Sequence, residues 1–220
     1  NTSSSIREAF PTPINYVLVA PRVDFQAGPR GAVTIRDMFY RTDQTGIGVG
    51  TLNLPSQASN VLSEENQLQI GETFLANARF VNETHFQWSH IYNDQVAANA
   101  APTVIVQGAF TSGGSSSGIM RDTQENFELQ NDSAATVGAH ALRFGAHLRA
   151  YDDRSFSTAG VNGTYYFSSV AAYQAHTPAQ YSATVISNPL VRILLFDGSL
   201  YFQDDWHWKP NLMIGAGLRV

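Results

Sequence analysis

Histidines and carboxylates are the side chains of this 220-residue chain that could bind a metal or transfer protons. The histidines are too scattered for a shared site, because no two lie two residues apart on one strand face or four apart on a plausible helix. Cysteine, the other common zinc ligand, is absent. A zinc centre needs at least three converging protein ligands, so the sequence predicts no metal site. The six histidines are His85, His90, His140, His147, His176 and His207.

Adjacent carboxylates occur at Glu64-Glu65, Asp152-Asp153 and Asp204-Asp205, a composition that could suggest glycosidase chemistry. Neighbouring side chains of a strand point to opposite faces, so Asp204 and Asp205 cannot act on one substrate atom. The glycine- and serine-rich stretch 113–118 lacks the lysine and the helix of a phosphate-binding loop, and no G-x-S-x-G motif is present. We therefore expect no catalytic residue, no cofactor-binding residue, no cofactor and no enzymatic activity.

The composition limits which partners and which kind of membrane-spanning element the chain can have. Thirteen basic residues against 18 acidic ones give a formal net charge of −5, which argues against nucleic acid held by phosphate neutralisation. The absence of cysteine is compatible with an oxidising compartment such as the periplasm. Apolar runs such as Ile193 to Phe196 fall far short of the roughly 18 residues needed for a spanning helix. If the chain crosses a membrane, it does so with strands.

The last 25 residues, Phe196 to Val220, have the pattern of a membrane-barrel hairpin. One face of the first strand is apolar and aromatic, and the opposite face is polar, as the two-residue period of a strand requires. A short Lys209-Pro210-Asn211 turn separates it from a second alternating strand. Tryptophans beside the turn suit the interface of a bilayer. The apolar positions are Phe196, Leu200, Phe202, Trp206, Trp208, Leu212, Ile214, Ala216, Leu218 and Val220.

Long strands separated alternately by short turns and long loops are predicted along the whole chain, as in bacterial outer-membrane barrels. Turns are expected at 26–31, 76–79, 137–140 and 208–211, and loops at about 44–66, 94–120 and 152–189. Pro21 is expected to cause a bulge, residues 163–167 to form a short strand, and residues 170–174 one helical turn. The eight expected strands are Asn15–Phe25, Ala32–Asp43, Gln67–Leu75, Val81–Asn93, Arg121–Ala135, Ala141–Tyr151, Val191–His207 and Leu212–Val220.

These strands predict an all-β fold, namely an antiparallel transmembrane β-barrel segment in an up-and-down meander that forms a curved, unclosed sheet. Residues 1–220 are expected to be part of one β-barrel domain. The chain starts without Met or a signal sequence and stops in the middle of a strand pattern. We therefore expect a fragment, with the plug and the remaining strands elsewhere in a longer chain.

The strand at 141–151 predicts which face meets water. Leu142, Phe144, Ala146, Leu148 and Ala150 alternate with a face that carries two arginines and a histidine, which would be costly in lipid. That second face is therefore expected to line the lumen, where its charges either contact a plug or solute or form salt bridges with one another. The predicted lumen-lining residues are Arg143, His147, Arg149, Asp197, Gln203, Asp205 and Arg219, and the predicted aromatic girdle is Trp88, Trp206 and Trp208.

Two sets of residues resemble the TonB-dependent outer-membrane receptors, and within them the Oar-like branch. The first set is the hairpin with Tyr201-Phe202-Gln203-Asp204-Asp205-Trp206, Lys209-Pro210-Asn211-Leu212 and Gly217-Leu218-Arg219, and the second is Gly138 to Gly145 followed by Arg149. Arg22-Val23-Asp24 and Gly163 to Phe167 add weaker matches. Val220, where the family usually has Tyr, and the irregular 213–216 stretch depart from the pattern. No TonB box or plug domain is recognisable in these residues.

The resemblance implies energised uptake of a solute across the bacterial outer membrane. The implied partners are outer-membrane lipid, a plug domain of the same full-length chain, the TonB complex and a solute whose identity is unknown. Two alternatives remain open from the residues alone. One is a complete eight-stranded outer-membrane barrel with a structural or adhesive role, and the other is a soluble β-sandwich binding module.

Overall fold

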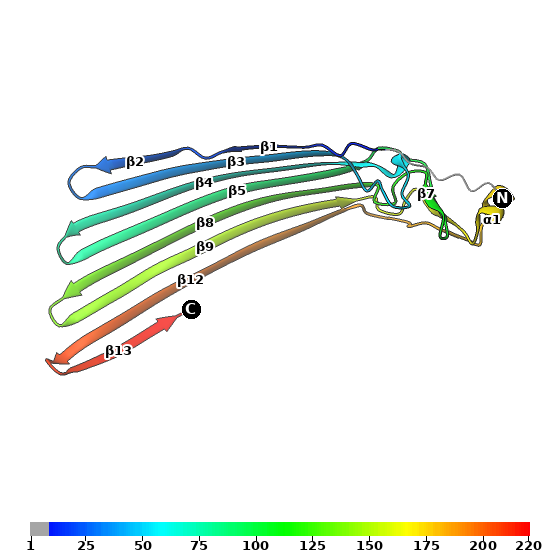
Figure 1. Cartoon of the computed structure of the whole chain (residues 1–220). Coiled ribbons are helices and arrows are strands. Elements are labelled where there is room, and N and C mark those ends of the chain that lie inside the picture. Colours follow the sequence, from blue (N-terminus) through cyan, green and yellow to red (C-terminus); the bar gives the residue numbers. More distant parts are fainter. Residues whose placement is uncertain (1–8) are drawn as a thin grey trace.

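A long, gently curved antiparallel sheet dominates the computed structural model, which describes residues 9–220 (Figure 1). Its strand order is β1-β3-β4-β5-β8-β9-β12-β13, and β2 pairs with β3 in line with β1. Neighbours in the sheet are neighbours along the chain apart from the loop strands, so this is an up-and-down meander. The strands are β1 Ile14–Val19, β2 Arg22–Ala27, β3 Gly31–Ile47, β4 Ser59–Asn77, β5 Phe80–Ala97, β8 Ile119–Val137, β9 His140–Ser157, β12 Leu190–Lys209 and β13 Leu212–Arg219.

Short turns join the strands at one end of the sheet, and long loops join them at the other (Figure 1). The four turns lie where the sequence predicted them. Gly28 and Gly138 adopt left-handed backbone conformations, with φ of 74° and 61°, which explains glycine at these two positions. The predicted bulge at Pro21 is a full break between β1 and β2, since proline has no N–H to donate to the sheet.

Most strands are longer than the sequence predicted, so the expected loop boundaries at 44, 66, 94 and 152 are wrong, while the boundary at about 120 agrees with the start of β8. β3, β5 and β9 continue to Ile47, Ala97 and Ser157, while β4 and β8 begin at Ser59 and Ile119. The extensions of β4 and β9 carry charged side chains on both faces, at Glu64-Glu65 and at Asp152-Asp153-Arg154, and therefore lack apolar alternation. At about 3.3 Å per residue, strands of 17 to 20 residues exceed the ~9–11 residues that cross a bilayer.

The sheet has two free edges, at β1-β2 and at β13, because these strands do not pair with each other. The alternative of a closed eight-stranded barrel is therefore not the structure that the described residues adopt. Residues 9–220 do not form a β-sandwich either, since none of their elements makes a second layer over the long sheet. Among residues 9–220 the buried hydrophobic side chains are Ala58, Val106 and Phe167, and all three belong to the loop end.

The loops fold into a small second sheet at the far end of the long strands (Figure 1). Its order is β11-β10-β6-β7, and β6 and β10, from two different loops, pair in parallel. The predicted short strand and helical turn are present as β10 and α1. In the described chain, no helix has the length and apolar character that crossing a bilayer demands. The elements are η1 Pro55–Gln57, β6 Thr103–Val106, β7 Phe110–Ser112, β10 Thr164–Phe167, α1 Val170–Gln174 and β11 Gln180–Ser182.

Candidate functional site

The strand register divides the side chains of the long sheet between a polar face and an apolar face. Residues directly opposite each other on paired strands share a face. Asp197 lies opposite Arg149, Gln203 opposite Arg143, and Tyr201 opposite both Gly145 and Arg219. All seven residues predicted to line the lumen therefore lie together on the polar face, which spans β9, β12 and β13.

Several of these residues bind one another or their neighbours. Arg149 Nε lies 3.3 Å from Asp197 Oδ2, and His147 Nε2 lies 2.7 Å from Oε1 of Glu128 on β8. The Gln203 amide donates to both carboxylate oxygens of Asp205 at 3.3 Å. Arg219 donates to the Ser199 hydroxyl at 3.4 Å. The charges on this face are thus partly neutralised by one another. Mutual ion pairing is one of the two roles that the sequence left open for them, the other being contact with a plug or solute.

Tyr201 makes a contact across a whole strand that the sequence did not reveal. Its hydroxyl on β12 donates to Asp132 Oδ1 on β8 at 2.6 Å, passing over β9, which lies between them. Gly145 is the β9 residue opposite both partners. Alternation already placed Tyr201 on the polar face, but β8 is polar on both faces, so Asp132 could not be assigned to a face without the register.

The polar face also contains hollows that could receive part of a solute or of another domain. One of about 450 Å³ lies over β3, β4, β5 and β8. Its polar lining includes Thr34, Arg36, Gln69, His85, Gln87 and Gln130. A second of about 800 Å³ lies near the short turns, and Arg143 borders it together with Arg30 and Arg79. Hydrogen-bonding groups and cations line both hollows, which suits contact with polar or anionic groups.

The opposite face is apolar and largely uncovered. Phe196 is 72% exposed, Leu218 69% and Leu200 59%. A water-soluble monomer rarely exposes a contiguous apolar surface of this extent. Lipid contact accounts for it, because the side chains that alternate toward the outside of a membrane barrel form an apolar band. A small polar group near the turns, made by Asn82, Thr84, Asn131 and Ser133, is satisfied by internal hydrogen bonds.

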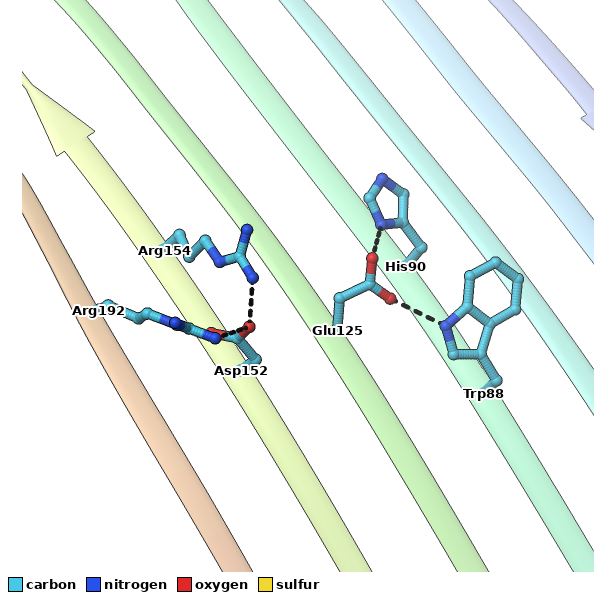
Figure 2. A network of polar contacts seen from close by, with 6 residues as sticks. All are labelled: Trp88, His90, Glu125, Asp152, Arg154 and Arg192. Carbon is cyan, nitrogen blue, oxygen red and sulfur yellow. Dashed lines mark hydrogen bonds and ion pairs between the residues drawn. The ribbon is translucent and has the colours of Figure 1, made fainter.

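Toward the loops the apolar face becomes charged (Figure 2). Glu125 on β8 accepts from Trp88 Nε1 at 2.9 Å and lies 2.7 Å from His90 Nδ1 on β5. On β9 and β12, Asp152 binds Arg154 at 2.7 Å and Arg192 at 2.8 Å. Trp88 therefore lies at the boundary between the apolar band and an ion-paired zone. This boundary is where a bilayer interface would place an amphipathic ring.

The other two predicted girdle residues, Trp206 and Trp208, lie at the short-turn end of β12. Their ring centroids are 6.0 Å apart. The two ends of the sheet's apolar face are thus marked by tryptophan, one at the charged zone and two at the β12–β13 turn.

The loop sheet is held by buried polar contacts. Gln57 is buried, with an exposed fraction of 7%. Its side-chain amide donates to the carbonyls of Ser112, Gly113 and Gly114 at 2.7, 3.2 and 2.8 Å. Phe110 and Phe167 each meet Tyr173 of α1 edge to face at 5.3 Å. Across residues 9–220, no group of three or more His, Asp or Glu side chains is arranged to hold a metal ion.

The comparisons with known proteins agree with this geometry. A family model described as an outer membrane beta barrel domain matches residues 3–220. The outer membrane transporter YddB from Escherichia coli has a similar solved structure, with a TM-score of 0.59 and 12% sequence identity. The match covers 93% of this chain and 26% of the transporter, so the chain spans about a quarter of that protein. No curated protein matches the sequence significantly. The open meander, its polar and apolar faces and the family match over nearly the whole chain lead to one conclusion: this is an outer-membrane protein that belongs to the outer membrane β-barrel domain family.

Proposed function

We propose that the chain is part of the barrel wall of a TonB-dependent outer-membrane receptor that mediates energised uptake of a solute. The observation that carries this proposal is the polar face, which is continuous over β3 to β13 and is backed by a lipid-type apolar face. Such a wall suits a wide, water-filled or plugged lumen. The finer assignment to a TonB-dependent, Oar-like receptor rests on the sequence motifs.

The motif residues have definite structural roles, which supports using them for the assignment. Tyr201 and Gly145, from the two motifs, meet in the bridge to Asp132. The backbone of Gly217 lies close to Phe202, and an added Cβ would be 3.3 Å from the Phe202 carbonyl oxygen. Pro210 and Asn211 form the tight turn between β12 and β13. The motif residues therefore contribute to the folding of this hairpin. In the proposal, the energised step of uptake is carried out by other parts of a longer protein.

In the proposed receptor, the polar face contacts the plug domain and the passing solute. The part of the proposed lumen wall on β9, β12 and β13 includes the cations Arg143, Arg149 and Arg219 and the anions Asp197 and Asp205, and Glu128 of β8 lies opposite Arg149. Arg149 and Asp197 are only half-buried, with side-chain exposures of 44% and 48%, so both can reach a partner in the lumen. The loop sheet provides the proposed first contact with the solute from outside, because it covers the loop end of the wall.

Medium depletion in matched bacterial strains tests the proposal. The strains make the full-length protein or lack it, each with and without a functional TonB protein, and mass spectrometry follows the components of the growth medium. We expect a solute class whose removal needs both the full-length protein and TonB. Removal that needs the protein but continues without TonB would instead indicate a passive channel. If no component differed between the strains, uptake as such would be refuted.

A further inference from the structure

A continuous ladder of four side chains marks the apolar face at the β12–β13 turn. His140 stacks on Trp206 with ring centroids 5.5 Å apart and planes 9° apart. Trp206 is followed by Trp208 at 6.0 Å, and the ammonium group of Lys209 lies 5.1 Å from the Trp208 ring centroid. The order His–Trp–Trp–Lys places an aromatic pair between two side chains that can donate hydrogen bonds to an anion.

A β-bulge brings Lys209 to this face. Strict alternation from Trp206 and Trp208 would place Lys209 on the polar face. The register shifts between His207 and Lys209, so that Lys209 lies opposite Leu212, which belongs to the apolar face. A bulge puts two residues opposite one and redirects the following side chain. The cation therefore joins the tryptophans instead of the lumen wall.

Asp204 fixes the other end of the ladder. Its Oδ2 lies 2.7 Å from His140 Nδ1, and because an ionised carboxylate only accepts hydrogen bonds, Nδ1 carries the proton. The second oxygen, Oδ1, is buried without a hydrogen-bond partner in the described chain. His140 keeps an exposed side chain, at 43%, and its Nε2 is turned away from Asp204. When the imidazole is protonated, Nε2–H is a free donor at the edge of the ladder.

We propose that this ladder is a binding site for glycerophospholipid, with Lys209 and His140 as separate ligands for the phosphate groups of neighbouring lipid molecules. The rings take the boundary between acyl chains and head groups, which tryptophan favours. Charge-assisted hydrogen bonds from an ammonium or imidazolium group to a phosphate are among the stronger polar contacts. Exposed Leu212 and Ile214 continue the apolar face beside the rings and contact the acyl chains.

The position of the ladder in the sheet indicates which leaflet of the membrane supplies the lipid. Figure 1 shows the β12–β13 turn at the end of the sheet opposite the loops, and short turns face the periplasm in outer-membrane barrels. The ligand is therefore a phospholipid of the periplasmic leaflet. The inference rests on the outer-membrane location and the described geometry, and it stands whether or not the protein proves to be a TonB-dependent receptor.

Native mass spectrometry of the full-length protein tests the site. The protein is released from nanodiscs that contain equal amounts of phosphatidylcholine and digalactosyl diacylglycerol, a bilayer lipid without phosphate, and the lipids that remain bound are counted. We expect the wild type to retain mainly phospholipid. Lys209→Gln should lower the ratio of retained phospholipid to galactolipid by about tenfold, as the loss of one charge-assisted hydrogen bond predicts. His140→Gln should cause a separate loss of similar size.

The matched control is His207→Gln, which removes an imidazole beside the same turn but from the opposite, polar face of β12, outside the ladder. It should leave the retained lipids unchanged. Because Lys209 is exposed beside a turn, its substitution should not prevent folding, and migration of the unheated barrel on a gel checks this. Equal retention of both lipids by the wild type, an unchanged ratio in Lys209→Gln, or an equal loss in His207→Gln would each overturn the site.

Discussion

The Tyr201 hydroxyl reaches Asp132 directly above Gly145, so two strands that are not neighbours in the sheet are tied together over the one between them. A Cβ on Gly145 would meet the Tyr201 ring at 2.6 Å and Asp132 Oδ1 at 2.8 Å, as well as the Asn131 carbonyl oxygen. Glycine is required here for space, because its missing side chain is the room through which Tyr201 passes. The bridge links β8 and β12 independently of the backbone hydrogen bonds of β9.

Gly145→Ala should therefore destabilise the barrel, by about 1–3 kcal/mol, because overpacking forces neighbouring side chains from their positions. Tyr201→Phe should cost about 1 kcal/mol by removing the hydrogen bond alone. Urea unfolding of the full-length protein in liposomes, followed by gel mobility of the folded form, measures both changes.

Gly71→Ala provides the matched control for Gly145→Ala, since Gly71 lies on the same face of β4 and an added Cβ would meet only the His85 ring, 3.3 Å away at Nδ1. That ring can move aside, so the effect on the free energy of unfolding should be small. Equal destabilisation by the two substitutions would show that the space above Gly145 has no special importance.

The pair Arg149–Asp197 should contribute little by itself. Both side chains are about half exposed and 3.3 Å apart, and exposed ion pairs are worth 0 to about 1 kcal/mol. A double-mutant cycle with Arg149→Gln and Asp197→Asn in the full-length protein is expected to give a coupling energy below about 1 kcal/mol. A coupling of about 3 kcal/mol or more is typical of a desolvated pair, and it would mean that another domain covers this part of the wall.

The sequence predicted the elements whose signals are local. Turns such as 208–211 contain Pro or Gly, and Ser169 caps the helical turn at 170–174 by accepting from Ala172 N–H at 3.1 Å. The polar face of β9 and β12 followed from alternation, because arginine at 143 and 149 cannot face hydrocarbon. These features need no information about distant parts of the chain.

Features that depend on position relative to the bilayer or on pairing were not predictable. Asp152 and Arg154 interrupt the apolar pattern and were expected in a loop, yet they lie in a strand that extends beyond the apolar band, where Asp152 forms ion pairs with both Arg154 and Arg192. The face on which Asp132 lies could not be assigned without the register of β8. The face of Lys209 could not be predicted either, because a β-bulge places its side chain on the face opposite to the one that strict alternation assigns.

Leu148→Arg should destabilise the barrel much more than His147→Arg, although the two residues are adjacent on β9. Leu148 lies on the apolar face and is 41% exposed, whereas His147 lies on the polar face beside Glu128. An arginine facing the bilayer midplane costs about 2–4 kcal/mol, while an arginine beside Glu128 keeps an ion pair. Urea unfolding in liposomes compares the two variants, and comparable losses would contradict the assignment of the faces.

Gln57→Ala should loosen the loop sheet without unfolding the barrel. The substitution removes the amide donor of the Ser112, Gly113 and Gly114 carbonyl groups, and Gly114 keeps another donor, the Thr103 hydroxyl at 2.6 Å. Each buried carbonyl left unsatisfied costs about 1–3 kcal/mol where water cannot replace the amide. Limited proteolysis of the full-length protein should then show faster cleavage between residues 107 and 118, while the barrel keeps its folded mobility on a gel. Asn53→Ala is the matched control, because the Asn53 amide donates only to Gly48 of its own loop, at 2.9 Å. Cleavage of Gln57→Ala at the rate of Asn53→Ala would show that Gln57 does not hold the two loops together, and the loop sheet would then depend on the aromatic contacts of Tyr173 instead.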